Sequence, residues 1–453
     1  MIEEILMAIV IKNGILIDGT GRPPTDDAIV VIEENKIIYA GKEKDFSQPF
    51  PSDAEIIDAH GKTLLPGLID AHVHYGGSGG VQASEEHTPQ EVTKRLYGFL
   101  INGVTTIRSC MDALNWAKQL REMERNGKVL MSHLFISGPC FTAPKGHGTE
   151  YAQNPKLLQQ MARTPTNEDD AREMVRELVK EDVDFIKIII EGRPPFEKLK
   201  AELACVIVDE AHKNGLKASV HTHEYGDAFH MVRCEADSLE HGAAGIKAPD
   251  DEIIKLMKKN GTYYVPTLVV HENLSMDSKK IETFLDNHQL RRSVSSVIIQ
   301  NIRNAISQKM KSRSEAMPKK QDLELMRNRM RSLFRDLIKS LDWIRNAGIP
   351  IVAGSDMGNF LTFPGISLHR ELELLVNAGL FPMDAIKAAT RNAAKLLGTE
   401  HKLGTVEKGK LADIIIINGN PLSNISEIRK IETVIKDGQI LDLNELTEKI
   451  NIG

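Results

Sequence analysis

Long apolar runs are missing from this chain of 453 residues. No stretch reaches the roughly 18 apolar residues that a membrane-spanning helix needs, so we expect no membrane association. The N-terminal segment MIEEILMAIVIKNG begins with two acidic residues and has no basic region before its apolar part. We therefore expect no secretory signal peptide and a cytoplasmic location.

An excess of basic charge is also missing. The formal net charge is −6, because 57 lysine and arginine residues face 63 acidic ones. Proteins that bind nucleic acid usually carry a basic surface patch, so we expect no nucleic acid partner. The hydrophobic fraction of 41% and the charged fraction of 26% are ordinary for a soluble globular enzyme. The length allows one large domain and one smaller domain.

Cysteine is scarce as well. The four cysteines are scattered along the chain, and no two of them form the CxxC pair of a zinc or redox motif. We expect all of them to be reduced thiols, as is usual in a cytoplasmic protein. They are Cys110, Cys140, Cys205 and Cys234.

The chain does contain a regular alternation of apolar strands and amphipathic helices. Eight candidate strands in residues 65–395 predict an α/β fold with a parallel (β/α)8, or TIM, barrel. A doubly wound sheet is the alternative that the pattern alone leaves open. The candidate strands are GLIDAHVH, VTTIRSC, HLFISGP, DFIKIII, LKASVHTH, ADSLEHG, YYVPTLVV and IPIVAGSD.

Two further regions complete the predicted organisation. Residues 1–64 and 396–453 are rich in short strands, and we expect both ends to form one small β-sandwich domain. A polar, helical segment at about 275–345 interrupts the alternation between the seventh and eighth strands. It is either a long outer helix of the barrel or a lid over the carboxyl ends of the strands.

The first barrel strand ends in two histidines, His72 and His74. Side chains alternate between the faces of a strand, so these two imidazoles point the same way. Two imidazoles at one strand end can bind a metal such as zinc. Taken alone, the pair could equally be two solvated histidines.

Other strand ends offer matching groups. Lys187 lies in the apolar run DFIKIII, where a charged lysine is costly unless it is paired or chemically changed. His221 and His223 share one face of VHTHE, and His241 follows the sixth strand. Asp356 follows the eighth strand, where a carboxylate could bind a metal and accept a proton. Because a barrel brings these strand ends together, we expect the groups to converge.

The order of these groups resembles a known family. The segments PGLIDAHVH, IK in the fourth strand, VHTHE, EHG and GSDMG are similar to motifs of the amidohydrolase superfamily. The tail AIKAATRNAAKLLGTEHKLGTVEKGKLADIIIINGNPL is similar to that of metal-dependent members with a flanking β-sandwich. The resemblance covers nearly the whole chain. It lies within the prolidase-like and arginine/lysine carboxypeptidase-like branch, near the imidazolonepropionases.

The resemblance implies a site with two zinc ions per chain, bridged by a carboxylated Lys187. His72, His74 and Asp356 would bind the more buried zinc, and His221 and His241 the more exposed one. Asp356 would also be the catalytic proton shuttle. The implied reaction is hydrolysis of an amide C–N bond in a small-molecule or dipeptide-like substrate, by a dipeptidase, a carboxypeptidase or an N-acyl amino acid hydrolase.

Further residues would contact the substrate. His147, in the loop KGHGTEY, resembles a family histidine that contacts the scissile carbonyl oxygen or a substrate carboxylate; the alternative is an exposed loop histidine. His223 would be a catalytic or substrate-binding group, or it would support a neighbouring ligand. Glu224 and Tyr225 stand where many members of the branch have a small residue, and we expect both to shape the substrate pocket.

Two rival functions remain open from the sequence. A mononuclear cyclic-amide hydrolase or deaminase of the imidazolonepropionase type is favoured by Glu224, three residues after His221, and disfavoured by Lys187. A non-catalytic binding protein on the same fold is the remote alternative. We also expect the chain to form a homo-oligomer.

Overall fold

The fold is described by a computed structural model that covers residues 8–50, 53–77, 89–192, 194–246, 251–311 and 320–451. Residues 1–7 and 452–453 of the predicted terminal domain, and 312–319 of the predicted helical insertion, lie outside the described residues. Within the described ranges, no helix is long and apolar enough to cross a lipid bilayer.

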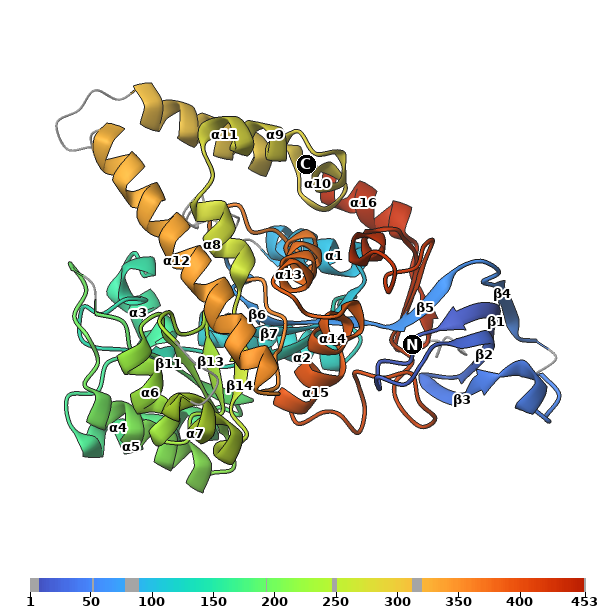
Figure 1. The fold of residues 1–453 in the computed structure, drawn as a ribbon, viewed down its shortest axis with the longest axis horizontal. Coiled ribbons are helices and arrows are strands. Elements are labelled where there is room, and N and C mark those ends of the chain that lie inside the picture. Colours follow the sequence, from blue (N-terminus) through green and yellow to red (C-terminus); the bar gives the residue numbers. More distant parts are fainter. Residues whose placement is uncertain are drawn as a thin grey trace.

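Both ends of the chain contribute to one eight-stranded sheet, seen at one end of the molecule in Figure 1. The C-terminal part joins the N-terminal part where Ile415 pairs with Leu65 in antiparallel register. The division of this sheet into the two layers of a sandwich, and the domain boundaries, stay predictions. The strands are β1 (Ile9–Leu16), β2 (Thr25–Glu33), β3 (Lys36–Lys42), β4 (Glu55–Asp58), β5 (Thr63–Pro66), β15 (Ile414–Ile417), β16 (Ile431–Lys436) and β17 (Gln439–Ile440).

The middle section is built from parallel strands, as the alternating pattern predicts. Seven of the eight candidate segments contain a strand. The strands form one sheet in the order β6-β7-β8 and a second in the order β10-β9-β11-β12-β13-β14. They are β6 (Leu68–Val73), β7 (Val104–Ser109), β8 (His133–Ile136), β9 (Cys140–Phe141), β10 (Ala162–Arg163), β11 (Phe185–Ile189), β12 (Lys217–His221), β13 (Ser238–Glu240) and β14 (Tyr263–Val265).

Single backbone contacts connect the two parallel sheets. The amide of Asp184, just before β11, donates to the carbonyl oxygen of Ile136 in β8 over 2.8 Å. The eighth candidate segment forms only isolated parallel bridges, Ile351 to Tyr264 and Met357 to Val73. The order is that of the predicted TIM barrel, but the assigned strands form two sheets, so the closure of the barrel stays a prediction.

The seventh candidate strand is shorter than predicted. YYVPTLVV is extended only over β14, and helix α8 (Leu268–Leu274) begins within its second half. Pro266 has no amide to donate to a neighbouring strand, and Thr267 has a left-handed φ of 44°. These two residues turn the chain, so the apolar run LVV is the start of a helix and not the end of a strand.

Helices separate the parallel strands. Helix α4 begins after Asn167, whose side chain accepts from the amide of Asp170, and it buries Ala171, Val175 and Leu178 as its 3.6-residue period predicts. The helices before the insertion are α1 (Pro89–Ile101), α2 (Leu114–Arg125), α3 (Pro155–Met161), α4 (Glu168–Lys180), α5 (Ala201–Lys213), α6 (Tyr225–Arg233) and α7 (Glu252–Asn260). Those after it are α13 (Ile366–Asn377), α14 (Pro382–Ala388), α15 (Arg391–Leu396) and α16 (Leu443–Asn451).

The segment predicted as a helical insertion is helical in its described residues. It contains α9 (Ser278–Leu285), α10 (His288–Ser293), α11 (Ser296–Lys311) and α12 (Lys320–Asn346). Figure 1 shows α11 and α12 reaching together beyond the parallel strands, with α8 beside α12. A role as a lid stays a prediction.

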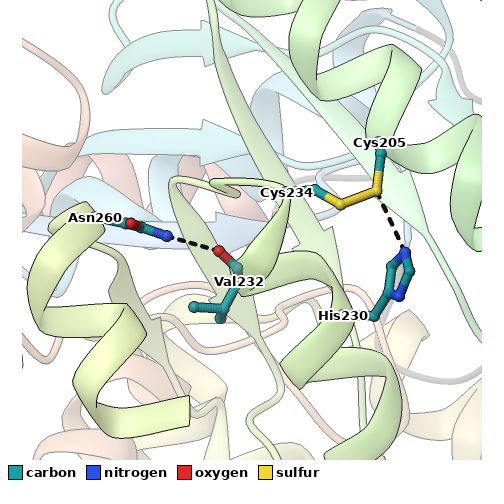
Figure 2. The surroundings of a disulfide bond; sticks show 5 residues. All are labelled: Cys205, His230, Val232, Cys234 and Asn260. Atoms are coloured by element: carbon teal, nitrogen blue, oxygen red, sulfur yellow. Dashed lines mark hydrogen bonds between the residues drawn. A yellow bond between two sulfur atoms is a disulfide. The ribbon is translucent and has the colours of Figure 1, made fainter. Parts of the chain in front are cut away.

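One prediction about the cysteines is wrong. Cys205 in α5 and Cys234 at the end of α6 form a disulfide, shown in Figure 2, with Cα atoms 5.3 Å apart. The two residues are 29 positions apart on neighbouring helices, so no local motif could reveal the pair. Cys110 and Cys140 are free and buried, as predicted. The disulfide removes one argument for a reducing compartment, and the cytoplasmic location stays a prediction.

Candidate metal centre

Histidines from three strand ends lie together at the carboxyl side of the parallel strands. The ring centroids of His72 and His241 are 4.6 Å apart, and those of His241 and His221 are 4.4 Å apart. His74 adjoins His72 at 5.3 Å, and His223 adjoins His221 at 4.8 Å. The structure therefore brings together all the histidines that the sequence predicts at these strand ends.

The backbone is strained at two of these strand ends. His241 has a φ of 65° and Asp356 a φ of 55°, both in the left-handed region that non-glycine residues seldom adopt. Asp70 in β6 helps to fix the second of them, because it accepts from the amide and the hydroxyl of Ser355 over 2.9 and 2.5 Å. Backbone strain of this kind persists mainly at functional sites, where it keeps side chains in the orientation that the site requires.

His72, His74 and Asp356 form the first group of possible ligands. Oδ1 of Asp356 lies 3.1 Å from Nε2 of His74 and 3.7 Å from Nε2 of His72. Burial raises the pKa of Asp356, but the neighbouring His74 and His72 outweigh it and hold the pKa well below its usual range. Burial, aided by the Lys187 charge, lowers the pKa of His72 to about 4. The group thus pairs an ionised carboxylate with a neutral imidazole.

The other nitrogen of each ligand histidine is already occupied. Nδ1 of His72 lies 2.6 Å from Glu240 and Nδ1 of His74 lies 3.3 Å from the carbonyl oxygen of Met111. Carboxylate and carbonyl oxygens only accept, so both Nδ1 atoms carry the proton. Nε2 of His72 then offers a lone pair, which is the usual arrangement of a metal-binding histidine, whereas Nε2 of His74 faces the carboxylate of Asp356.

Lys187 is buried in β11 beside β12, with 1% of its surface exposed. Its Nζ has no hydrogen-bond partner in the described part of the chain. Its charge lowers the pKa of His72, His221 and His241. The amine therefore lies within electrostatic reach of the group around His72 and also of His221 and His241. Among the described residues, no carboxylate forms a hydrogen bond with Nζ of Lys187. A hydrogen-bonded ion pair at the strand end therefore does not neutralise this lysine.

His221 and His147 share an acidic neighbour that the sequence did not suggest. Oε2 of Glu191, two residues after β11, lies 3.0 Å from Nε2 of His221 and 3.9 Å from Nε2 of His147. Because a carboxylate only accepts, Nε2 of His221 carries a proton and Nδ1 is left for a metal. His147 is held by Glu150 at 2.5 Å, and its ring lies 5.3 Å from that of His221. His147 is thus part of the cluster.

Glu224 and Tyr225 lie beside the cluster and have other neighbours. Glu224 is exposed and precedes α6. The hydroxyl of Tyr225 donates to Asp251, and its ring stacks on Phe229. Their predicted contacts with a substrate stay predictions.

Comparisons with known proteins give this arrangement a family. The sequence model described as "Amidohydrolase family" matches residues 63–441. The chain belongs to the amidohydrolase family. It is 26% identical to an ochratoxinase of Aspergillus niger, over 95% of this chain and 86% of that protein. It is 24% identical to an imidazolonepropionase of Geobacillus kaustophilus, over 92% of this chain and 90% of that protein.

A solved structure supports the fold class of this amidohydrolase. The crystal structure of a Xaa-Pro dipeptidase with bound methionine in the active site is 26% identical and covers 96% of this chain and 100% of its own, with a TM-score of 0.75. The amidohydrolase family has the TIM-barrel class of fold, and it hydrolyses C–N bonds. Both predictions are confirmed at that level.

The residues of this amidohydrolase fit the metals on which the family generally depends. Buried Nε2 of His72, Nζ of Lys187 and Oδ1 of Asp356 all lack a hydrogen-bond partner in the described residues. Unpartnered buried polar atoms are rare in folded proteins, and these three belong to residues that the sequence predicts as metal ligands. Imidazole and carboxylate ligands suit zinc and its neighbours among the transition metals.

Three residues of the cluster were missed from the sequence. Glu191 follows a strand by two positions, and Glu240 lies inside SLEHG, so the signal for both was an acid next to a predicted ligand. His271 lies in α8, 5.2 Å from the ring of His223, and both its ring nitrogens are unpartnered. It directly follows YYVPTLVV, the predicted seventh strand, and was not singled out as a candidate ligand.

Proposed function

We propose that this amidohydrolase is a zinc-dependent enzyme that cleaves the amide C–N bond of dipeptides or N-acyl amino acids. The observation that carries the proposal is the buried Nζ of Lys187, which has no hydrogen-bond partner among the described residues and lies near the candidate ligand histidines. A buried ammonium next to two cations would be strongly repelled. A lysine in this place therefore needs a chemical change before metals can bind.

Addition of CO2 to Lys187 supplies that change. The neutral amine forms a new C–N bond to CO2 and releases one proton, which leaves a carbamate with a negative charge. The two oxygens of the carbamate can each bind one cation. In this proposal His72, His74 and Asp356 would hold one zinc, His221 and His241 would hold the second, and the carboxylated Lys187 would be a ligand of both.

Zinc ions, when bound, acidify water and polarise a carbonyl group. The chain supplies the proton transfers. Asp356 is ionised and accepts the proton of the attacking water, then gives it to the nitrogen of the leaving amine. Asp356 is placed for this role by Ser355 and Asp70, and by the adjacent imidazole of His74.

The substrate lies on the side of His147 in this proposal. His147 contacts the scissile carbonyl oxygen or a carboxylate of the substrate, with Glu150 and Glu191 fixing its ring. His223, Glu224 and Tyr225 border the same space. The substrate is a small molecule, and we further propose a cytoplasmic homo-oligomer.

The comparisons support substrates that contain an amino acid. One similar structure is a Xaa-Pro dipeptidase with methionine in its active site. A second candidate, a cyclic-amide hydrolase or deaminase, is favoured by the similarity to imidazolonepropionase. That reading uses one metal and leaves Lys187 unmodified.

Metal content and a substrate screen separate these candidates. We expect about two zinc ions per chain and hydrolysis of dipeptides or N-acyl amino acids in a panel that also holds cyclic amides. One metal with cyclic-amide opening would favour the second candidate. Absence of both metal and hydrolysis would leave a binding protein on this fold.

A further inference from the structure

His271 is a buried imidazole with both ring nitrogens unused. It is 3% exposed, and neither Nδ1 nor Nε2 has a hydrogen-bond partner in the described residues. Leaving a buried polar atom unpaired costs about 1–3 kcal/mol. An apolar residue would fill the same place without that loss, so we infer that the imidazole has a partner that the described residues do not supply.

Helix α8 holds this imidazole in a fixed place. The amide of Val269 donates to Glu371 of α13 over 2.8 Å, and Nδ2 of Asn273 donates to the carbonyl oxygen of Leu361 over 2.8 Å. These two contacts lie on either side of His271 and tie α8 to buried neighbours. The position of His271 is therefore fixed by the packing of α8 and does not vary as that of an exposed side chain does.

Two other imidazoles face His271. The ring of His223 lies 5.2 Å away at 83°, and that of His241 lies 6.4 Å away at 86°. One nitrogen from each of the three lies within 4.8 Å of the others. Around a tetrahedral zinc with Zn–N bonds of about 2.0–2.1 Å, ligand nitrogens are about 3.4 Å apart. We expect side-chain rotations on metal binding to bring the three nitrogens from within 4.8 Å to that spacing.

The charges nearby favour a cation. Oε1 of Glu191 lies 3.8 Å from Nδ1 of His223, and Oδ2 of Asp356 lies 3.9 Å from Nδ1 of His241. Carboxylates at these distances attract a cation and repel an anionic substrate group. Nitrogen ligands select zinc, cobalt or nickel over magnesium and calcium.

We propose that His223, His241 and His271 form a three-imidazole site for a divalent transition-metal ion. This site shares His241 with the second zinc position of the proposed function. The shared residue is the one point at which it rests on that proposal. Nδ1 of His241 forms a hydrogen bond with Oγ1 of Thr267 over 2.8 Å, so Nε2 is the nitrogen of His241 that can bind a metal. His241 thus serves one of two positions at a time, with His221 and Lys187 or with His223 and His271.

The test is a Co2+ titration of metal-free protein, followed by the visible absorption of bound cobalt. His271→Leu should weaken one binding step by at least about tenfold, because loss of even a supporting partner of a metal ligand costs that much. The step assigned to His72, His74 and Asp356 should stay unchanged. The Tm of the metal-free variant should equal or exceed that of the wild type, since no hydrogen bond is lost.

His369→Leu is the matched control. His369 is also a buried histidine on a helix, but its Nε2 lies 2.9 Å from the carbonyl oxygen of Asn102. This variant should lower the Tm of the metal-free protein and leave every Co2+ step unchanged. A merely structural role for His271 would make the two variants behave alike.

A double variant guards against a packing defect. His223→Asn should weaken the same Co2+ step as His271→Leu, and the double variant should be little weaker than either one. Unchanged Co2+ binding in His271→Leu, or independent effects of the two changes, would overturn the proposal. The titration contains no substrate, so its outcome is separate from that of the hydrolysis screen.

Discussion

Nδ1 of His72 and Oε2 of Glu240 lie 2.6 Å apart, and neither side chain is exposed. Glu240 also accepts from Arg108 over 2.6 Å, from Ser219 over 2.7 Å and from Ser238 over 2.5 Å. Burial raises the pKa of Glu240, but the guanidinium of Arg108 and the hydrogen bond from His72 outweigh it and hold the pKa well below its usual value. An ionised carboxylate therefore fixes the tautomer and the direction of His72, the first proposed metal ligand.

Glu240→Gln should weaken this centre without touching a metal ligand. The charge of Arg108 would be left buried and unpaired, which costs about 3–5 kcal/mol of unfolding free energy. Affinity for zinc should fall about 10–100-fold, because His72 would no longer be held by a carboxylate. Chemical denaturation and metal content on one preparation measure both effects.

Ser238→Ala is the control for Glu240. It removes one hydrogen bond to the same carboxylate and keeps the charge, so a loss of about 1 kcal/mol with normal zinc affinity is expected. Unchanged zinc affinity in Glu240→Gln would show that Glu240 supports the fold alone.

Lys187→Ala should lose metal and activity together, and a short carboxylic acid should restore part of both by replacing the carbamate. Lys187→Arg should not be restored, because a guanidinium cannot supply a bridging carboxylate. A crystal structure of the metal-loaded protein should show a carboxylate on Lys187. Full occupancy of two metals beside an unmodified Lys187 would contradict the proposed bridge.

Asp356→Asn should lower kcat by about 10²–10⁴-fold, the usual contribution of a general acid or base. The amide oxygen of Asn can still face the metals, so most of the zinc should stay bound. Metal content and kcat are measured on the same preparation. A variant that keeps two zinc ions and near-normal turnover would remove Asp356 from the proton transfers.

The sequence predicted the convergence of the candidate ligands better than their surroundings. His72, His74, His221, His241 and Asp356 follow apolar strands, and parallel strands end on the same side, so their convergence followed from local pattern. The charge pair between Arg108 and Glu240 joins residues 132 positions apart. Each is the one charged residue of its strand, and a single sequence does not say which opposite charge it meets.

The limits of the fold prediction have the same cause. Strand alternation placed seven of the eight parallel segments, but the turn at Pro266 and Thr267 converted the end of the seventh into α8. A short apolar run such as LVV fits a strand or a helix equally well. Because of that ambiguity, His271 was not recognised from the sequence as part of the site. The disulfide was not predicted because its two cysteines lie on different helices, α5 and α6, 29 positions apart.

The last prediction concerns pH and α8. Burial raises the pKa of Glu371 from 4.5 to about 8, and its Oε2 accepts from the amide of Val269 in α8. Between these two pH values the folded protein keeps a proton that the unfolded chain has released, so stability falls as pH rises. At about 1.4 kcal/mol per pKa unit, the loss is on the order of a few kcal/mol across that window.

Glu371→Gln should remove this loss, because glutamine keeps the hydrogen bond to Val269 and does not ionise. The Tm of Glu371→Gln relative to wild type should therefore rise between pH 5 and about 8.

Glu373 on the same helix is the control of opposite sign, since Arg429 and Arg370 outweigh burial and lower its pKa. Glu373→Gln should destabilise at neutral pH, and the difference from wild type should shrink as pH falls through the range where Glu373 is protonated. Parallel Tm curves for wild type and Glu371→Gln across this range would mean that Glu371 is ionised in the folded protein, and that α8 is held by a charge and not by a neutral acid.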